Sequence, residues 1–385
     1  MIPVIVNTSP GEEFQLSRRF WQGCPTILRT PKGRLYAGWY SGGTGEPAPD
    51  NYNLLIKSDD EGWNWSPPVA VVASGMKNEY KYIAIDIQLW LDPFNRMWMF
   101  ITQRYLGEKW KITDTGHLAL WAAVCEDPDA ENPVWGKPQY ITNGFLRTQP
   151  TVLSNGDWLL CAYNWCHDHY QYCRSSDQGR TWINCKAGKK QNPDFDETMI
   201  LERKDGTLLM LARDIKRQLV KTESSDLAGS SWSDGTYTTL LNAGSRFFLR
   251  RLKSGRFLLI HNEAHDFRRN LVAKLSEDDG ETWPYSLQLD DAETPERSIS
   301  YPDAVESEDG RLFIIYDRGR NTFREILMAQ ISEEDIINGT LCRQDSYLRR
   351  IISKAHCPAD RQEYEALKQS DEKWKEEFFW KTCRL

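Results

Sequence analysis

The chain has 385 residues, a formal net charge of −7 and a pI near 5.6, which disfavours nucleic acid or an anionic membrane as its main partner. No stretch is long and apolar enough to span a bilayer, and residues 1–14 lack the basic start and apolar core of a secretory signal. We therefore expect a cytoplasmic protein, with a secreted protein whose signal was removed as the alternative.

Six short turns recur about every 50 residues, and each is followed directly by a hydrophobic strand. The turn dipeptides are Lys32-Gly33, Phe94-Asn95, Asn155-Gly156, Asp205-Gly206, Ser254-Gly255 and Asp309-Gly310. Gly and Asn tolerate the positive φ of a tight turn, and the sequences on both sides favour β-structure. Each copy therefore predicts a β-hairpin.

A second motif, Ser-x-Asp-x-Gly-x-x-Trp, recurs in phase with the hairpins. It occurs at residues 58–65, 175–182 and 276–283, with a longer, degenerate copy at 224–232. Trp135, in ENPVWGKP, is what remains of a fifth copy. We expect a turn that closes on itself, in which the Ser and Asp oxygens accept bonds from backbone N–H groups and the Trp packs between sheets. This motif is the Asp-box.

Six four-stranded sheets in one closed array predict an all-β fold, a six-bladed β-propeller with Asp-box turns. We assign residues 1–340 to the propeller and residues 341–385 to a C-terminal helical tail, because ADRQEYEALKQSDEKWKEEFFWKT has apolar residues near helical spacing. The tail is expected to pack near the point where the ring closes, and a partner-binding helix is the alternative.

The cysteines suggest packing more than metal binding. The nine Cys are an odd number, and their scatter through predicted strands fits reduced, buried thiols. The densest group comprises Cys161, Cys166, Cys173 and Cys185, with His167 and His169 nearby. It contains no C-x-x-C pair, so we expect no metal site and no cofactor.

Polar residues gather at the starts of the innermost predicted strands, where the blades of a propeller face its centre. The set comprises Arg18, Arg19, Gln22, Asp86, Arg147, Gln149, Asp196, Glu197, Arg246, Tyr301 and Asp303. A polar funnel at one end of the channel would need such groups. The alternative is a rim of salt bridges.

These segments resemble the sialidase (neuraminidase) superfamily of Asp-box propellers over about residues 16–335. FDETMILERKDGTLLMLARD is similar to the family segment with a Glu and a later Arg, here Glu197 and Arg213. RRNLVAKLSEDDGETW resembles the segment with another substrate-binding Arg, here Arg268 or Arg269. ISYPDAVESEDGRLFIIYD resembles the segment with the nucleophilic Tyr, here Tyr301. Asp50, in PAPDNYNLLIKS, stands where the family has its acid/base Asp.

The resemblance implies a retaining exo-glycoside hydrolase of sialidase type that acts on a carbohydrate. Sialic acids carry a carboxylate on the anomeric carbon, which would repel an anionic nucleophile, whereas a Tyr activated by a Glu avoids that repulsion. Tyr301 and Glu197 would form this pair. Arginines would grip the substrate carboxylate, and Asp50 would protonate the leaving oxygen, a role that calls for a buried carboxyl group.

The first predicted blade departs from the family. Sialidases carry an Arg-Ile-Pro there, whereas this chain reads RRFWQGCPTI, so Arg19 or Arg246 would have to replace the missing arginine. A bacterial subgroup of Asp-box proteins without an assigned substrate is more similar, sharing RRF-x-Q-G-x-P, FDE-x-MI, SRFF-x-RRL and SYPD. That likeness implies a core of Asp196, Arg246, Tyr301 and Asp303, with Arg147 and Asp86 as further substrate-binding residues.

Other functions remain open. A carbohydrate-binding propeller would need no acid/base pair, whereas Glu197, Tyr301 and Asp50 are all present. A lyase or glycosidase acting on a uronic or neutral sugar would also use arginine, and His261 would be its base. A protein-interaction propeller would show an apolar or charged patch on its blade faces.

Overall fold

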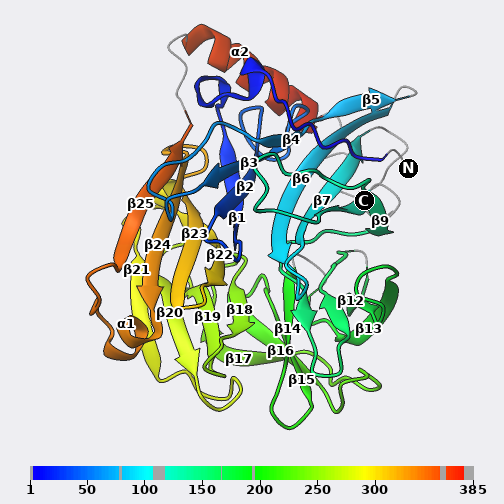
Figure 1. The fold of residues 1–385 in the computed structure, drawn as a ribbon, viewed down its shortest axis with the longest axis vertical. Helices are drawn as coiled ribbons and strands as arrows, with labels where there is room; N and C mark the ends of the chain where they lie inside the picture. The colour runs from blue at the N-terminus through cyan, green and yellow to red at the C-terminus, as the bar shows by residue number, and fades with distance from the viewer. Residues whose placement is uncertain are drawn as a thin grey trace. The chain divides into compact units, whose positions relative to one another are not determined.

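The computed structural model describes residues 3–77, 80–106, 118–165, 167–192, 196–355 and 361–376. Within these ranges the strands form six sheets that follow one another along the chain (Figure 1). In each sheet the strands pair in sequence order, as successive hairpins do. The predicted all-β, six-bladed β-propeller is confirmed.

The first three sheets have these strands. The first contains β1 (Gln22–Arg29), β2 (Leu35–Ser41), β3 (Tyr52–Ser58) and β4 (Ala70–Val72). The second contains β5 (Gly75–Lys77), β6 (Tyr80–Leu91), β7 (Met97–Leu106), β8 (Leu118–Cys125) and β9 (Gln139–Thr142). The third contains β10 (Thr151–Val152), β11 (Trp158–Leu160), β12 (His169–Ser175) and β13 (Ile183–Lys189).

The last three sheets follow the same plan. The fourth contains β14 (Thr198–Glu202), β15 (Leu208–Ala212), β16 (Gln218–Ser224) and β17 (Thr236–Leu241). The fifth contains β18 (Phe248–Arg251), β19 (Phe257–Asn262), β20 (Leu271–Ser276) and β21 (Tyr285–Asp290). The sixth contains β22 (Ile299–Glu306), β23 (Arg311–Arg318), β24 (Glu325–Ser332) and β25 (Tyr347–Lys354), so its last strand lies beyond residue 340.

Helices are few in the described part of the chain. The α-helices are α1 (Glu333–Asn338) and α2 (Arg361–Trp374), and short 3-10 turns occur at Glu12–Phe14, Leu16–Arg18 and Pro295–Arg297. A capping box between Ser332 and Asp335 starts α1, and Gly339 in the left-handed conformation ends it. None of the described helices is long and apolar enough to cross a membrane.

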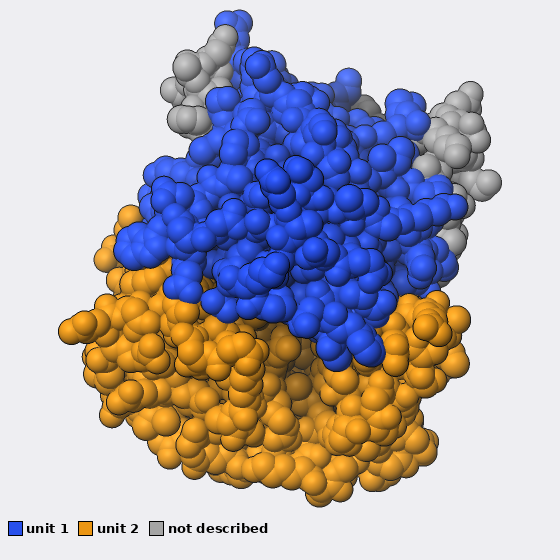
Figure 2. Space-filling view, viewed as in Figure 1, with its two compact units in different colours: residues 1–146, 317–327, 351–385 blue, residues 147–316, 328–350 orange. Residues whose placement is uncertain are grey.

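The chain divides into two compact units (Figure 2). The first unit comprises residues 1–146, 317–327 and 351–385, and the second comprises residues 147–316 and 328–350. In the first, a core that includes Tyr36, Leu55 and Met97 packs between the first and second sheets. In the second, one core lies between the third and fourth sheets and another between the fourth and fifth. Apolar burial between neighbouring sheets thus stabilises each unit.

The Asp-boxes have the expected structure. Gly62 N–H donates to Ser58 Oγ at 2.9 Å, Asn64 N–H donates to Asp60 Oδ1 at 2.8 Å, and the Trp65 indole donates to the Gly62 carbonyl at 3.1 Å. Gly62 has φ of 85°, which a glycine adopts without strain. The copies at 175–182 and 276–283 repeat the Ser and Asp contacts. These residues are structural, as predicted.

The tail helix α2 packs against the rest of the first unit. Asp371, which is buried, accepts hydrogen bonds from Thr44 N at 2.8 Å and Thr44 Oγ1 at 2.9 Å. The Tyr364 hydroxyl accepts from Arg324 Nη2 at 3.0 Å. Thr44 lies between strands of the first sheet and Arg324 directly precedes β24, so α2 contacts segments of the first and the last sheet.

Candidate functional site

Tyr301 lies on β22 in an unusual backbone conformation. Its φ is 56°, in the left-handed region, and its side chain is buried. A bulky residue in this region stores about 1–3 kcal/mol of strain, which is common at functional sites. The conformation turns the Tyr301 side chain relative to its neighbours in the strand.

Glu197 and Arg213 meet the Tyr301 hydroxyl group. The Tyr301 hydroxyl donates to Glu197 Oε1 at 2.8 Å, and Arg213 Nη1 donates to Glu197 Oε2 at 2.9 Å and to the Tyr301 oxygen at 3.0 Å. Glu197 directly precedes β14 and Arg213 directly follows β15. Thr198 pairs with Ala212 in the ladder between β14 and β15. This register places Glu197 and Arg213 at the same end of the two strands.

Arg147 and Arg268 flank the same phenol. The guanidinium carbon of Arg147 lies 4.7 Å from the centre of the Tyr301 ring, and that of Arg268 lies 5.2 Å from it. Arg147 Nε is also 3.6 Å from Glu197 Oε1. Arg268 Nη2 donates to the Gly244 carbonyl at 3.0 Å, which fixes its orientation. Three arginines therefore surround one carboxylate and one phenol, and the cluster is cationic.

The electrostatics of the cluster follow from burial and these arginines. Burial alone would raise the pKa of Glu197, but the charges of Arg213 and Arg147 outweigh it and lower that pKa to about 2. Burial raises the pKa of the Tyr301 phenol, and the arginines oppose this rise while Glu197 adds to it. At neutral pH Glu197 is ionised and Tyr301 is protonated, so the hydrogen bond between them runs from the phenol to a carboxylate.

Arg246 is bonded to the backbone around Tyr301. Its side chain is 1% exposed, and its guanidinium donates to the carbonyls of Arg147, Tyr301 and Pro302, each at 2.8 Å. Three of the five N–H donors of this buried guanidinium are therefore bonded to backbone carbonyls. Arg246 holds the left-handed Tyr301 peptide in place.

Asp196 and Asp303 are also buried, and each contacts a neighbouring side chain. Asp196 Oδ2 lies 2.9 Å from Lys190 Nζ, and burial raises the Asp196 pKa to about 6 although the Lys190 charge lowers it. Asp303 Oδ1 accepts from Gln149 Nε2 at 3.3 Å. The Asp196–Lys190 ion pair is of the kind that the salt-bridge alternative describes, whereas Asp303 accepts from a neutral amide. Lys190 carried no motif that could have identified it.

Arg19, Asp50 and Asp86 belong to the first unit. Arg19 is 3% exposed and its Nε donates to the Phe14 carbonyl at 3.1 Å. Asp86 is buried on β6 with φ of 44°. Asp50 is not buried as expected of an acid/base group: its side chain is 62% exposed and forms an ion pair with Lys81 at 3.0 Å.

His261 and the cysteines have structural surroundings. His261 is fully buried with its Nδ1 2.8 Å from the Leu241 carbonyl, and burial lowers its pKa to about 4. Cys161 and Cys173 are buried thiols, whereas Cys166 lies outside the described residues. In the described ranges, no three His, Cys, Asp or Glu side chains could hold a metal ion.

Comparison with solved structures shows the same fold. A Hadza microbial sialidase matches with a TM-score of 0.65 and 18% identity, over 82% of this chain and 66% of its own, slightly under two thirds of its length. The intramolecular trans-sialidase from Ruminococcus gnavus, solved with oseltamivir carboxylate, matches with a TM-score of 0.66 and 14% identity, over 86% of this chain and 98% of its own.

The leech intramolecular trans-sialidase, solved with 2,7-anhydro-Neu5Ac, matches with a TM-score of 0.68 and 14% identity, over 86% of this chain and 71% of its own. No curated protein sequence matches the chain. The family model for the BNR repeat-like domain matches residues 33–314, which include all the Asp-boxes and the residues around Tyr301. The chain therefore belongs to the BNR repeat-like domain family.

Proposed function

We propose that this chain is a sialidase-like exo-glycoside hydrolase that removes a terminal acidic sugar from a glycan or oligosaccharide. The observation that carries the proposal is the 2.8 Å hydrogen bond from the Tyr301 hydroxyl to the ionised Glu197, inside a cluster of three arginines. A structural tyrosine does not need a paired carboxylate and three cations. The sialidase and trans-sialidase folds matched above support the same reaction class.

In the proposed reaction, the Tyr301 oxygen attacks the anomeric carbon while its proton moves to Glu197 Oε1. The bond from the anomeric carbon to the leaving oxygen breaks, and an acid protonates that oxygen. Water then attacks the anomeric carbon, gives its proton to the conjugate base of that acid and displaces Tyr301, which recovers its proton from Glu197. Asp50 is the acid/base group that the family resemblance assigns.

The substrate carboxylate would be held by Arg213, Arg268 and Arg147. Arginine suits this role because its planar fork donates two parallel hydrogen bonds and keeps its charge when water is excluded. We assign to Arg147, which precedes β10, the carboxylate-binding role of the arginine that the first blade lacks. Arg246 is less suited to this role because its guanidinium already donates to backbone carbonyls.

The test is turnover of fluorogenic glycosides by the purified chain and by Tyr301→Phe, with Tyr285→Phe as the matched control at a strand start. The panel comprises a sialoside, a glucuronide, a galacturonide and neutral hexosides. We expect turnover of an acidic glycoside that falls at least about 100-fold in Tyr301→Phe and is unchanged in Tyr285→Phe. Turnover that survives Tyr301→Phe would exclude Tyr301 as nucleophile, and saturable binding without turnover would indicate a carbohydrate-binding propeller.

A further inference from the structure

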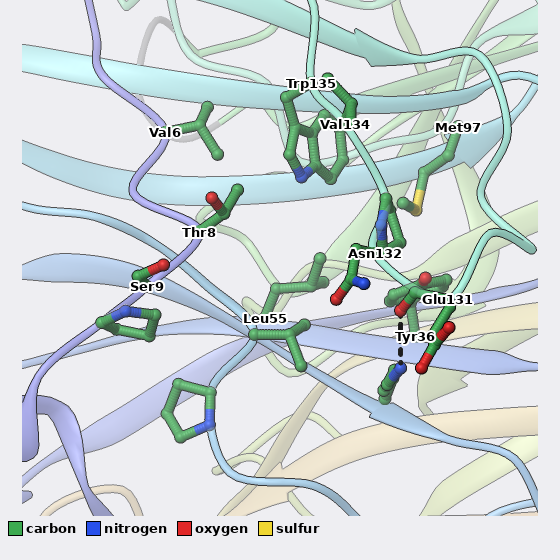
Figure 3. A pocket seen from close by; sticks show the side chains of 15 residues that line it. Val6, Thr8, Ser9, Tyr36, Leu55, Met97, Glu131, Asn132, Val134 and Trp135 are labelled. Atoms are coloured by element: carbon green, nitrogen blue, oxygen red, sulfur yellow. Dashed lines mark hydrogen bonds between the residues drawn. The ribbon is translucent and has the colours of Figure 1, made fainter.

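A pocket lies in the first unit, bounded by the N-terminal segment, the first sheet and the loop before β9 (Figure 3). Its volume is about 680 Å³, within the usual range for a small-molecule site. The N-terminal wall is held by a reciprocal pair of bonds between Asn7 and Val71, with N···O distances of 2.8 and 2.9 Å. The N-terminal segment is therefore paired with β4 at Asn7.

The floor of the pocket is apolar. Tyr36, Leu55 and Met97 are each no more than 1% exposed, and the Tyr36 hydroxyl is already bonded to the Pro128 carbonyl at 2.8 Å. Pro68, Pro133 and Val69 add further apolar surface. Because Tyr36, Leu55 and Met97 are buried, the apolar surface that a ligand could reach comes from Val69, Pro133, Val134 and the Trp135 ring.

Trp135, the remnant of the fifth Asp-box, lines the wall of the pocket. The Trp65 indole donates to the Gly62 carbonyl at 3.1 Å, whereas the indole nitrogens of Trp182 and Trp283, in the other intact copies, have no hydrogen-bond partner among the described residues. Around Trp135 the Ser, Asp and Gly of the motif are missing, but its backbone bridges to Cys125 as that of Trp232 bridges to Ser224 in the degenerate copy. Its indole N–H has no hydrogen-bond partner among the described residues, and Figure 3 shows this nitrogen on the side that faces Thr8. Trp135 therefore offers the pocket an aromatic ring and a hydrogen-bond donor.

The mouth of the pocket carries neutral polar groups. The side chains of Thr8, Ser9 and Asn132 line it, and none of them bonds to another residue in the described part of the chain. The charged residues of the lining are Lys57 and Glu131, one of each sign, with Lys57 Nζ 3.5 Å from the Glu131 carbonyl. The pocket thus has two hydroxyls, an amide and an indole N–H, but no excess charge.

We propose that this pocket binds a neutral pyranose residue of a glycan. A pyranose has an apolar face of C–H groups for the floor and the Trp135 ring, and a ring of hydroxyls for the neutral donors and acceptors at the mouth. An anionic sugar would need a surplus of cations, which the lining lacks. A proline-rich peptide would need exposed aromatic rings side by side, whereas Tyr36 is buried. The proposal is independent of the reaction assigned to Tyr301.

The experiment is ligand-observed NMR and calorimetry on the full chain. The probes are methyl glycosides of glucose, galactose, mannose and N-acetylglucosamine, with methyl glucuronide and a proline-rich decapeptide for comparison. The variants are Trp135→Ala and Asn132→Ala. The matched control is Trp63→Ala, because Trp63 is a 68% exposed tryptophan of an intact Asp-box outside the pocket.

We expect saturable binding of at least one neutral glycoside, weakened about tenfold or more in both pocket variants and unchanged in Trp63→Ala and Tyr301→Phe. If Trp135→Ala fails to fold, Asn132→Ala decides the question, because Asn132 is exposed. The proposal is overturned if no neutral glycoside binds, if the peptide alone binds, or if binding is lost in Tyr301→Phe and kept in Asn132→Ala.

Discussion

Replacing Glu197 with Gln tests the cluster around Tyr301 without any substrate. Glu197 is 2% exposed and its pKa falls from 4.5 to about 2 in the folded chain, equivalent to about 3 kcal/mol of stability at neutral pH. Glu197→Gln removes this charge and leaves Arg213 and Arg147 without their counter-ion. We expect a loss of about 3–5 kcal/mol at pH 7, because breaking a buried ion pair leaves an uncompensated charge.

The pH dependence gives the sharper result. A carboxylate with a lowered folded pKa stabilises the fold fully above its unfolded pKa, near 4.5, and loses that effect as the pH falls towards 2. The difference in stability between the wild type and Glu197→Gln should therefore be greatest at pH 6–7 and smaller by about 1.4 kcal/mol at pH 3.5.

The assay is thermal unfolding by circular dichroism from pH 7 to pH 3.5, with Glu308→Gln as the control. Glu308 is 88% exposed in an ion pair with Lys253, so its substitution should leave the melting temperature unchanged. For a unit of this size, 3 kcal/mol corresponds to a fall of about 6–12 °C in melting temperature. The reasoning would be refuted if Glu197→Gln and the wild type had the same melting temperature at pH 7. It would also be refuted if their difference in melting temperature did not change with pH.

Three further predictions concern Arg147, Arg246 and Asp371. Arg147→Lys should raise KM for the acidic substrate about tenfold with little change in melting temperature, because Lys keeps the charge but cannot donate two parallel bonds; an unchanged KM would exclude Arg147 from substrate binding. Arg246→Ala should lower the stability by about 3–5 kcal/mol in denaturant unfolding, since three buried carbonyls lose their donor, and an unaltered midpoint would contradict this. Asp371→Ala should speed hydrogen exchange of the Thr44 amide about tenfold or more, and unaltered exchange would mean that α2 does not hold this loop.

The sequence predicted those features that depend on local repetition. The hairpins were recognisable because each turn needs Gly or Asn, and the Asp-boxes because one Ser, one Asp and one Gly close each turn. Glu197 and Arg213 were identified by the resemblance of their segment to the family, and the register of the β14–β15 hairpin, which they flank, brings them together in the structure.

The features that depend on contacts between distant segments could not be predicted. An arginine that bonds three carbonyls and one that grips a ligand look the same in a sequence, so the role of Arg246 required the structure. The exposure of Asp50 follows from the fold of its loop. The neighbouring Asn51 side chain donates to the Gly42 carbonyl at 2.7 Å and accepts from Ala48 N at 2.6 Å, which directs Asn51 inward and leaves Asp50 outside.

A repeated backbone device accounts for the position of the proposed nucleophile. Cys24 and Tyr301 both precede a proline on the first strand of a sheet, and both have φ of 56°. The strain is stabilised differently in the two strands: Cys24 N–H donates to Asp317 Oδ2 at 2.8 Å, whereas the Tyr301 carbonyl accepts from Arg246 Nη2 at 2.8 Å. Arg246 donates to the Tyr301 backbone, and its guanidinium carbon lies 5.5 Å from the centre of the Tyr301 ring, which Phe retains, so Tyr301→Phe should keep this conformation. This left-handed backbone conformation is therefore structural, and the side chain at each position determines the chemistry there.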